Sequence, residues 1–154
     1  MILQFGTGNF LRAFVEVFVQ ELDRENKMAI GPVIAVQSAG RERADAIQAA
    51  KGGYHVAGQR FQDGRIVDQT VWVSSIQEAL DTGTQWDRVL EMACQADLIA
   101  FVSNATEAGL ALDERDAAGS SAASTDSRVT DPACSSAPHS FPAKLLACLR
   151  ARFD

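Results

Sequence analysis

Short apolar runs alternate with longer segments of helical periodicity along this chain. One run ends at Phe5 and another occupies Val33 to Gln37, so both are predicted to be buried parallel strands. From Asn9 to about Asn26, apolar residues recur at spacings of three and four, which predicts one helix. Its apolar stripe consists of Phe10, Phe14, Val17, Phe18 and Leu22.

The middle of the chain predicts a second helix and then a hairpin. The helix extends from about Arg41 to Ala50 and is closed by two glycines. Two β-rich segments, Tyr54–Phe61 and Arg65–Ser74, are separated by Gln62-Asp63-Gly64. Asp-Gly between apolar segments is a strong hairpin signal. We therefore expect an antiparallel pair that replaces or extends a third crossover.

The remaining elements are shorter, apart from one long segment without an apolar period. We predict a helical piece at Ile76–Leu80, a helix at Trp86–Cys94, a buried strand at Leu98–Val102 and a helix at Ala143–Phe153. Pro142 suits the first turn of that last helix. The segment from about 113 to 140 is rich in Ser, Ala and Asp and is predicted to be a flexible surface loop.

A glycine turn joins the first strand directly to the first helix. Gly6-Thr7-Gly8 follows Phe5, and the helix begins at Asn9. Gly6 permits a sharp turn, Gly8 lets an anion approach the backbone, and the helix end offers unpaired N–H groups. Strand, turn and helix together are typical of the phosphate-binding corner of a dinucleotide fold, although Leu11 replaces the third glycine of G-x-G-x-x-G. The alternative is a plain tight turn.

The order of strands and helices predicts an α/β fold. We expect a Rossmann-like, mostly parallel sheet with helices on both faces and an inserted antiparallel hairpin. The final apolar helix would normally return the chain to another parallel strand, and none follows Asp154. The expectation is an incomplete dinucleotide-binding domain over residues 1–154, with a flexible loop at about 113–140 and the C-terminal substrate domain absent.

Polar residues at the ends of strands extend the candidate site. Gln37 and Ser38 occupy the place where such folds set an acidic residue on the adenosine ribose. An amide can still bond a hydroxyl, and it does not repel a 2′-phosphate. Arg41 and Arg43 follow, either as partners of such a phosphate or as solvated helix residues. NAD is expected, and NADP is not excluded.

Ser103, Asn104 and Thr106 follow the predicted strand at Leu98–Val102, at the edge where open α/β sheets bind ligands. Glu107 could simply begin a helix. Arg12 either reaches the pyrophosphate or points to solvent. The predicted cofactor-binding residues are Gly6, Thr7, Gly8, Asn9, Phe10, Arg12, Gln37, Ser38, Ser103, Asn104 and Thr106, with no catalytic residue and no metal ligand assigned.

Charge and cysteine content narrow the classes of partner. The formal net charge of -6 makes a nucleic-acid backbone an improbable partner. No apolar run approaches the roughly 18 residues that a membrane span needs. The 3 cysteines are widely spaced and resemble neither a disulfide framework nor a zinc site. A reducing cytoplasm is therefore the expected compartment.

Three separated motifs resemble one known family. Gly6 to Phe14 is similar to the G-x-G-x-F-x-R-A corner of the polyol-specific long-chain dehydrogenases, the mannitol dehydrogenase family, which also lacks the third glycine. Ser103–Gly109 and Ser140–Leu145 resemble most the branch of tagaturonate reductases, or altronate oxidoreductases. The resemblance covers nearly the whole chain except the Ser/Ala-rich loop.

This resemblance implies an NAD-dependent oxidoreductase acting on CH–OH groups without a metal. The implied reaction reduces the keto group of a hexuronate, tagaturonate to altronate, by hydride transfer. In this family the catalytic lysine belongs to a helical C-terminal substrate domain, and no position here matches its motif, so this segment alone is expected to be inactive. The alternatives are a mannitol or fructuronate type of polyol dehydrogenase, a non-catalytic nucleotide-binding domain, or a methyltransferase-like domain. A methyltransferase-like domain would require an acidic residue ahead of the glycines, at the positions that Gln4 and Phe5 occupy.

Overall fold

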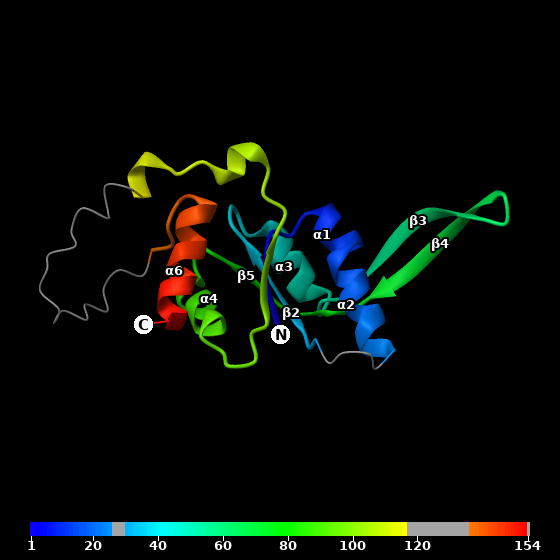
Figure 1. The fold of residues 1–154 in the computed structure, drawn as a ribbon, viewed down its shortest axis with the longest axis horizontal. Coiled ribbons are helices and arrows are strands. Elements are labelled where there is room, and N and C mark those ends of the chain that lie inside the picture. Colours follow the sequence, from blue (N-terminus) through cyan, green and yellow to red (C-terminus); the bar gives the residue numbers. More distant parts are fainter. Residues whose placement is uncertain (26–29, 117–135, 154) are drawn as a thin grey trace, which may run out of the picture.

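A parallel sheet of four strands forms the centre of the molecule, in the order β5–β2–β1–β6 (Figure 1). The computed structural model describes residues 1–25, 30–116 and 136–153. The strands are β1 (Ile2–Phe5), β2 (Val33–Gln37), β5 (Ile76–Asp81) and β6 (Ala100–Ser103). Every residue of β1 and β2 is buried, as continuous apolar runs predict for inner parallel strands. The α/β, mostly parallel architecture expected from the sequence is confirmed.

Helices cover both faces of this sheet because neighbouring strand residues point to opposite sides. On one face, Leu3, Phe5 and Val36 pack with α4 (Trp86–Ala93) and α6 (Phe141–Phe153). On the other face, α2 (Val15–Arg24) packs on Ile2 and Val33, and α3 (Glu42–Ala49) packs on Ala35 and Ile76. The core therefore forms two layers of side chains, one on each side of β1 and β2.

The single helix predicted from Asn9 is two helices. The segment divides into α1 (Asn9–Ala13) and α2 at Phe14, whose φ and ψ are -118° and -70°. Its buried side chains include Leu11, Glu16 and Val19, whereas the phenylalanines of the predicted apolar stripe are about half exposed. The apolar stripe found from the spacing is therefore not the buried face of these helices. Spacing identifies a row of apolar residues, but only the neighbouring elements decide which row is covered.

The helical piece predicted at 76–80 is also wrong, because this segment is strand β5. Glu78, Ala79 and Leu80 favour a helix locally, which is the reason for that prediction. In the folded chain β5 pairs in parallel with β2, and residues 79–81 are buried. Hydrogen bonding and burial in the sheet outweigh local propensity. β5 is consequently the third parallel strand, and the hairpin is an insertion before it.

The hairpin forms as the Asp-Gly signal predicts. β3 (Tyr54–Gln62) and β4 (Arg65–Val73) pair antiparallel, and the turn residues Asp63 and Gly64 have φ values of 50° and 75°. Figure 1 shows this ribbon projecting away from the sheet. Gln20 of α2 holds its root: Nε2 donates to the Trp72 carbonyl at 2.7 Å, and Oε1 accepts from the Ser74 N–H at 2.7 Å.

Most of the segment predicted as a flexible loop, about 113–140, lies outside the described residues. Its described ends meet at Asp116, whose carboxylate accepts the backbone N–H groups of His139 and Ser140 at 2.7 and 2.8 Å. The Ser140 hydroxyl donates to it as well, and this bond is the main cause that holds the Asp116 pKa below its usual value. The two ends of the segment are therefore tied together beside the start of α6.

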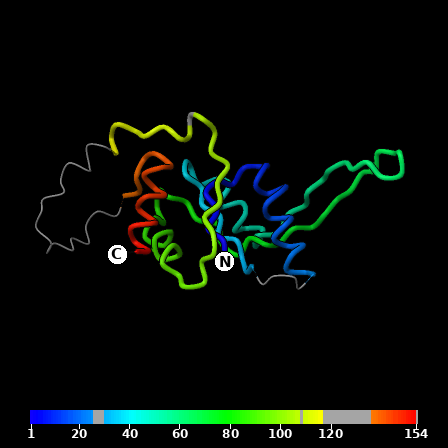
Figure 2. The backbone as a smooth tube through the Cα atoms, viewed as in Figure 1, coloured from blue at the N-terminus to red at the C-terminus, as the bar shows by residue number. Residues whose placement is uncertain are grey.

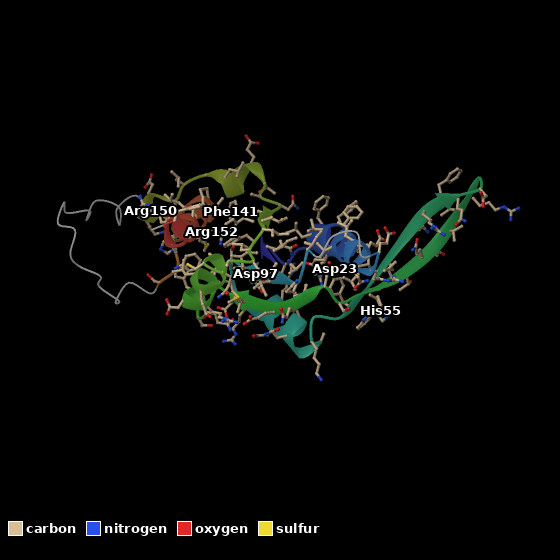
Figure 3. All side chains as sticks on the ribbon, turned by 60° about the horizontal axis from the view of Figure 1, so that its bottom comes forward. Asp23, His55, Asp97, Phe141, Arg150 and Arg152 are labelled. Atoms are coloured by element: carbon tan, nitrogen blue, oxygen red, sulfur yellow. The ribbon has the colours of Figure 1, made fainter. Side chains whose placement is uncertain are left out.

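After β6, the described chain passes along one end of the molecule and forms the short 3-10 helix η1 (Glu107–Leu110) (Figure 2). At the far end of α6, Arg152 donates to the carbonyls of Ala93 and Gln95 at 2.9 and 2.8 Å (Figure 3). These bonds attach α6 to the connection between α4 and β6. Within the described part of the chain, no helix has both the length and the apolar content needed to cross a membrane.

Candidate functional site

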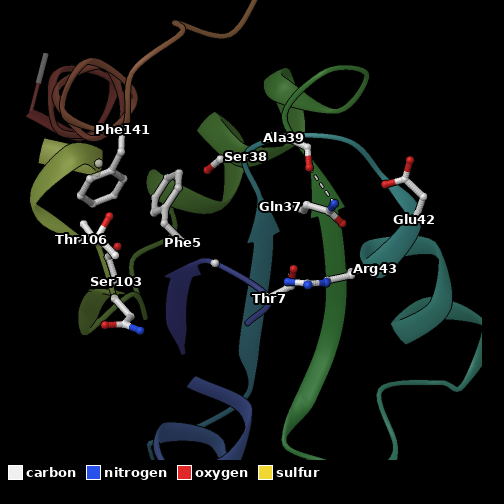
Figure 4. Close-up of a pocket in the computed structure, with 14 residues that line it drawn as sticks. Phe5, Thr7, Gln37, Ser38, Ala39, Glu42, Arg43, Ser103, Thr106 and Phe141 are labelled. Carbon is white, nitrogen blue, oxygen red and sulfur yellow. Dashed lines mark hydrogen bonds between the residues drawn. The ribbon is translucent and has the colours of Figure 1, made fainter. Parts of the chain in front are cut away.

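A cavity of about 590 Å³ opens at the carboxyl ends of the parallel strands (Figure 4). Phe5, Gln37 and Ser103, the last residues of β1, β2 and β6, all line it. The chain leaves β1 on the face of α2 and returns to β6 from the face of α4, so connections diverge between these two strands. Such a switch point is where open α/β sheets bind ligands.

Many of the predicted cofactor residues meet at this cavity. Those that line it are Gly6, Thr7, Gln37, Ser38, Ser103, Asn104 and Thr106. Thr7 is buried, whereas Ser38, Ser103, Asn104 and Thr106 expose their side chains. The remaining predicted residues, Gly8, Asn9, Phe10 and Arg12, are not part of the lining. Residues from three strand ends, far apart in sequence, are thus brought to one edge of the sheet.

The glycine corner leaves its backbone open to a ligand. Gly6 has a φ of 123°, and a Cβ there would lie 3.0 Å from the Leu11 side chain. Leu11, in place of the third glycine, is itself buried and fills the space beside Gly6. A Cβ at Gly8 would meet no heavy atom within 4 Å, and no side chain caps α1 at this residue. A bulky anion could therefore approach the Gly8 backbone.

The Gln37 side chain, which the sequence placed at the adenosine ribose, makes hydrogen bonds within the turn that follows β2. Its Nε2 donates to the Ala39 carbonyl at 2.7 Å, and its Oε1 accepts the Ala44 N–H at 2.8 Å. The side chain therefore closes the turn between β2 and α3 and supports the start of that helix. The exposed Ser38 hydroxyl is the better placed polar group for a ribose at this strand end. A cofactor contact by Gln37 stays a prediction.

Asn9 and Arg12 face a different cleft, between α1 and the root of the hairpin. This cleft measures about 300 Å³ and includes Tyr54 and His55. Arg12 Nη2 donates to Asn9 Oδ1 at 2.6 Å, and its guanidinium lies 5.4 Å from the centroid of the Tyr54 ring. These bonds engage both side chains beside the hairpin. A contact of Asn9 or Arg12 with the cofactor stays a prediction.

A buried carboxylate beneath the corner escaped the sequence analysis. Glu16 is fully buried; Gln4 Nε2 donates to it at 2.6 Å, and the Tyr54 hydroxyl donates to it as well. Burial raises the Glu16 pKa, while the bonds from Tyr54 and Gln4 act in the opposite direction. Gln4 Nε2 also donates to the Gly6 carbonyl at 3.1 Å, which links this network to the corner. The sequence feature that could have pointed to this buried network is Gln4, a polar residue inside an apolar strand.

The sequence analysis also did not assign several residues of the cavity wall. Phe5 and Phe141 form an edge-to-face pair, with ring centroids 5.6 Å apart, on the side of α6. Glu42 and Arg43, in the first turn of α3, stand on the opposite side (Figure 4). Phe141 belongs to the Ser-Phe-Pro motif noted above, and Arg43 was considered either as a partner of a 2′-phosphate or as a solvated helix residue. Phe5 carried no signal beyond its place at a strand end.

Two curated sequence relatives are both named altronate oxidoreductase. The chain is 34% identical over 154 residues to the altronate oxidoreductase of Halalkalibacterium halodurans, covering 99% of this chain and 27% of the relative. It is 34% identical over 115 residues to that of Bacillus subtilis, covering 75% of this chain and 24% of the relative. The chain therefore spans about a quarter of the length of these relatives. No family model matches it.

Solved structures agree on the fold. A mannitol 2-dehydrogenase of Pseudomonas fluorescens, in complex with NAD and D-mannitol, matches 98% of this chain and 30% of its own, with a TM-score of 0.75 and 16% identity. A D-sorbitol dehydrogenase matches 99% of this chain and 31% of its own, with a TM-score of 0.73 and 17% identity. The chain is therefore similar in sequence to enzymes named altronate oxidoreductase, and its Rossmann-like fold is similar to that of polyol dehydrogenases.

Proposed function

We propose that this chain is the cofactor-binding part of an NAD-dependent oxidoreductase that reduces the keto group of a hexuronate, tagaturonate to altronate. The curated relatives named altronate oxidoreductase support the substrate class. The relatives are about four times as long as this chain, and in this proposal a separate substrate domain completes the enzyme. We extend the proposal to a cytoplasmic enzyme, as expected from the cysteine pattern.

One observation carries the proposal: the open glycine corner stands at the switch point of the parallel sheet, beside a cavity lined by three strand ends. The position of a side chain at Gly8 is open, so a diphosphate could approach the backbone there. A mannitol 2-dehydrogenase of similar fold was solved with NAD bound. A nicotinamide cofactor is therefore the ligand that this cavity suits best.

When bound, such a cofactor supplies the hydride that reduces the substrate carbonyl. The backbone of Gly6 to Gly8 would hold its diphosphate, and the Ser38 hydroxyl would bond the adenosine ribose. Ser103, Asn104 and Thr106 would hold the nicotinamide side. The Phe5–Phe141 pair forms an apolar wall that keeps water from that side. The catalytic acid/base belongs to the substrate domain in this proposal.

Two other functions remain as alternatives. A mannitol or fructuronate type of polyol dehydrogenase would use the same cofactor half, since specificity resides in the substrate domain. A non-catalytic nucleotide-binding domain would use the corner without chemistry. The sequence relatives favour the hexuronate enzyme, because those matching nearly the whole chain bear one enzyme name.

Titration of the protein with NADH, followed by nicotinamide fluorescence, tests this proposal. We expect saturable binding that the variant Gly8→Val weakens at least about tenfold, because its side chain would occupy the space meant for the diphosphate. The variant should fold normally, since Gly8 has an extended backbone with φ of -73° and a Cβ there meets no neighbour. Absence of binding to both NADH and NADPH, or equal binding by Gly8→Val, would contradict the proposal.

A further inference from the structure

Three arginines lie in α1 or at the start of α3, and the structure distinguishes them by their partners. Arg12 bonds Asn9 and lies over the Tyr54 ring, on the side of the hairpin. Arg41 forms an ion pair with Asp45, with Nε to Oδ2 at 2.8 Å and Nη2 to Oδ1 at 3.2 Å. Both guanidinium groups are therefore already engaged within the protein.

Arg43 differs from both. Within the described residues, its side chain makes no hydrogen bond and no ion pair, and it is exposed at the start of α3. It lines the main cavity and also a cleft of about 270 Å³ that contains Arg12 and Tyr54. Figure 4 shows Arg43 extending from α3 toward Thr7, the middle residue of the glycine turn. An uncommitted cation thus faces the place where a phosphate would lie.

The nearby carboxylate does not neutralise this cation. Glu42 also lines the cavity, but its Oε2 lies close to Gly40 and accepts the Arg41 N–H at 3.2 Å. The last residue of β2 is Gln37, whose side-chain amide closes the turn before α3, so β2 ends without a carboxylate directed at the cavity. A negative ligand would therefore meet Arg43 without displacing an ion pair of the protein.

We propose that Arg43 binds a phosphate group of the dinucleotide, and that the exposed Arg41 beside it does not. The phosphate is either the diphosphate at the glycine turn or a 2′-phosphate on the adenosine ribose. This inference rests on the proposed function, because it assigns a residue to the same cavity. It separates two arginines that are indistinguishable in the sequence.

The test compares the matched variants Arg43→Gln and Arg41→Gln, which remove the same charge from neighbouring exposed positions. Each is titrated with NADH and with NADPH at low and at moderate salt, and circular dichroism checks that each variant is folded. We expect Arg43→Gln to weaken binding on the order of tenfold, the effect of losing a charge-assisted hydrogen bond. Arg41→Gln should bind as the wild type does, and added salt should reduce the difference between the variants.

The two cofactors identify the phosphate. An equal loss for NADH and NADPH in Arg43→Gln supports a contact with the diphosphate, and a loss confined to NADPH supports a contact with the 2′-phosphate. Wild-type affinity of Arg43→Gln, or an equal loss in Arg41→Gln, would overturn the inference while leaving the proposed function intact. A wild-type protein that binds neither cofactor would instead overturn the proposed function itself.

Discussion

The buried sheet and the projecting ribbon are both made of β-strands, but different forces hold them. Leu3, Val33 and Val36 are fully buried between helices on both faces of the sheet. In the β3–β4 ribbon, Phe61 and Ile66 are 77 and 69% exposed. The sheet depends on apolar burial, whereas the ribbon depends on its own hydrogen bonds, its Asp-Gly turn and its root. Strand formation alone therefore says little about how much a segment stabilises the fold.

The root of the ribbon is where the two regions meet. Tyr54 begins β3, packs against the core of α3 and donates to the buried Glu16. Val73, the last residue of β4, pairs with Tyr54 and is fully buried. The root is therefore stabilised by burial against the sheet and its helices, whereas the tip is not. The predictions below test this division by substitutions in the sheet, at the root and at the tip.

The largest effect is expected in the sheet. Leu3→Ala should lower the free energy of unfolding by about 3 kcal/mol, because it removes buried contacts and leaves a cavity. Urea denaturation measures the change, and Ile66→Ala on the ribbon serves as the matched control. If both substitutions cost the same, burial would not distinguish the two regions.

A smaller loss is expected at the root. Tyr54→Phe should cost about 2 kcal/mol, because it removes a hydroxyl that donates to a buried carboxylate. The same substitution in a Glu16→Gln background should cost less, since the charge that strengthens the bond is gone. Equal costs in both backgrounds would show that the hydroxyl does not act through Glu16.

The root should also respond to pH. Burial raises the Glu16 pKa above its value of 4.5 in the unfolded chain, so the folded state binds this proton more tightly than the unfolded chain does. Stability from this group is complete below the unfolded pKa and is lost as pH rises through the folded pKa. Relative to Glu16→Gln, the wild type should therefore gain stability as pH falls from 7 toward 4.5. The slope cannot exceed about 1.4 kcal/mol per pH unit for one proton. A difference between the two proteins that is independent of pH would contradict the raised pKa.

The smallest effect is expected at the tip. Phe61→Ser should change the free energy of unfolding by no more than about 0.5 kcal/mol, because this ring is mostly exposed. Thermal melting followed by circular dichroism would detect a larger change. A loss comparable to that of Leu3→Ala would mean that the tip is packed in solution, and the contrast between sheet and ribbon would disappear.

Local signals in the sequence account for much of the fold. Continuous apolar runs predicted β1 and β2, Asp63-Gly64 predicted the hairpin turn, and Pro142 marked the first turn of α6. The corner at Gly6 to Gly8 was also recognisable, because glycine is needed where φ is positive and where a backbone must stay open. Motifs at the strand ends identified much of the cavity lining in the same way.

Other features depend on contacts between distant segments. β5 is a strand because β2 supplies its hydrogen-bonding partner, although its own residues favour a helix. Three phenylalanines of α1 and α2 are exposed because other residues of these helices face the sheet. The burial of Glu16 follows from the approach of Gln4 and Tyr54, which lie 12 and 38 residues away in the sequence.

The sequence by itself determined the alternation of strands and helices, the glycine turn and the hairpin, because each depends on residues that are neighbours in the chain. Only the tertiary structure decided which apolar row is buried and that Gln37 closes a turn. It also decided that Arg41 pairs with Asp45 while Arg43 has no partner among the residues that the structure describes. The physical reason is that burial and pairing depend on what lies across space from a side chain. A cofactor site built from several strand ends is therefore only partly visible in the order of its residues.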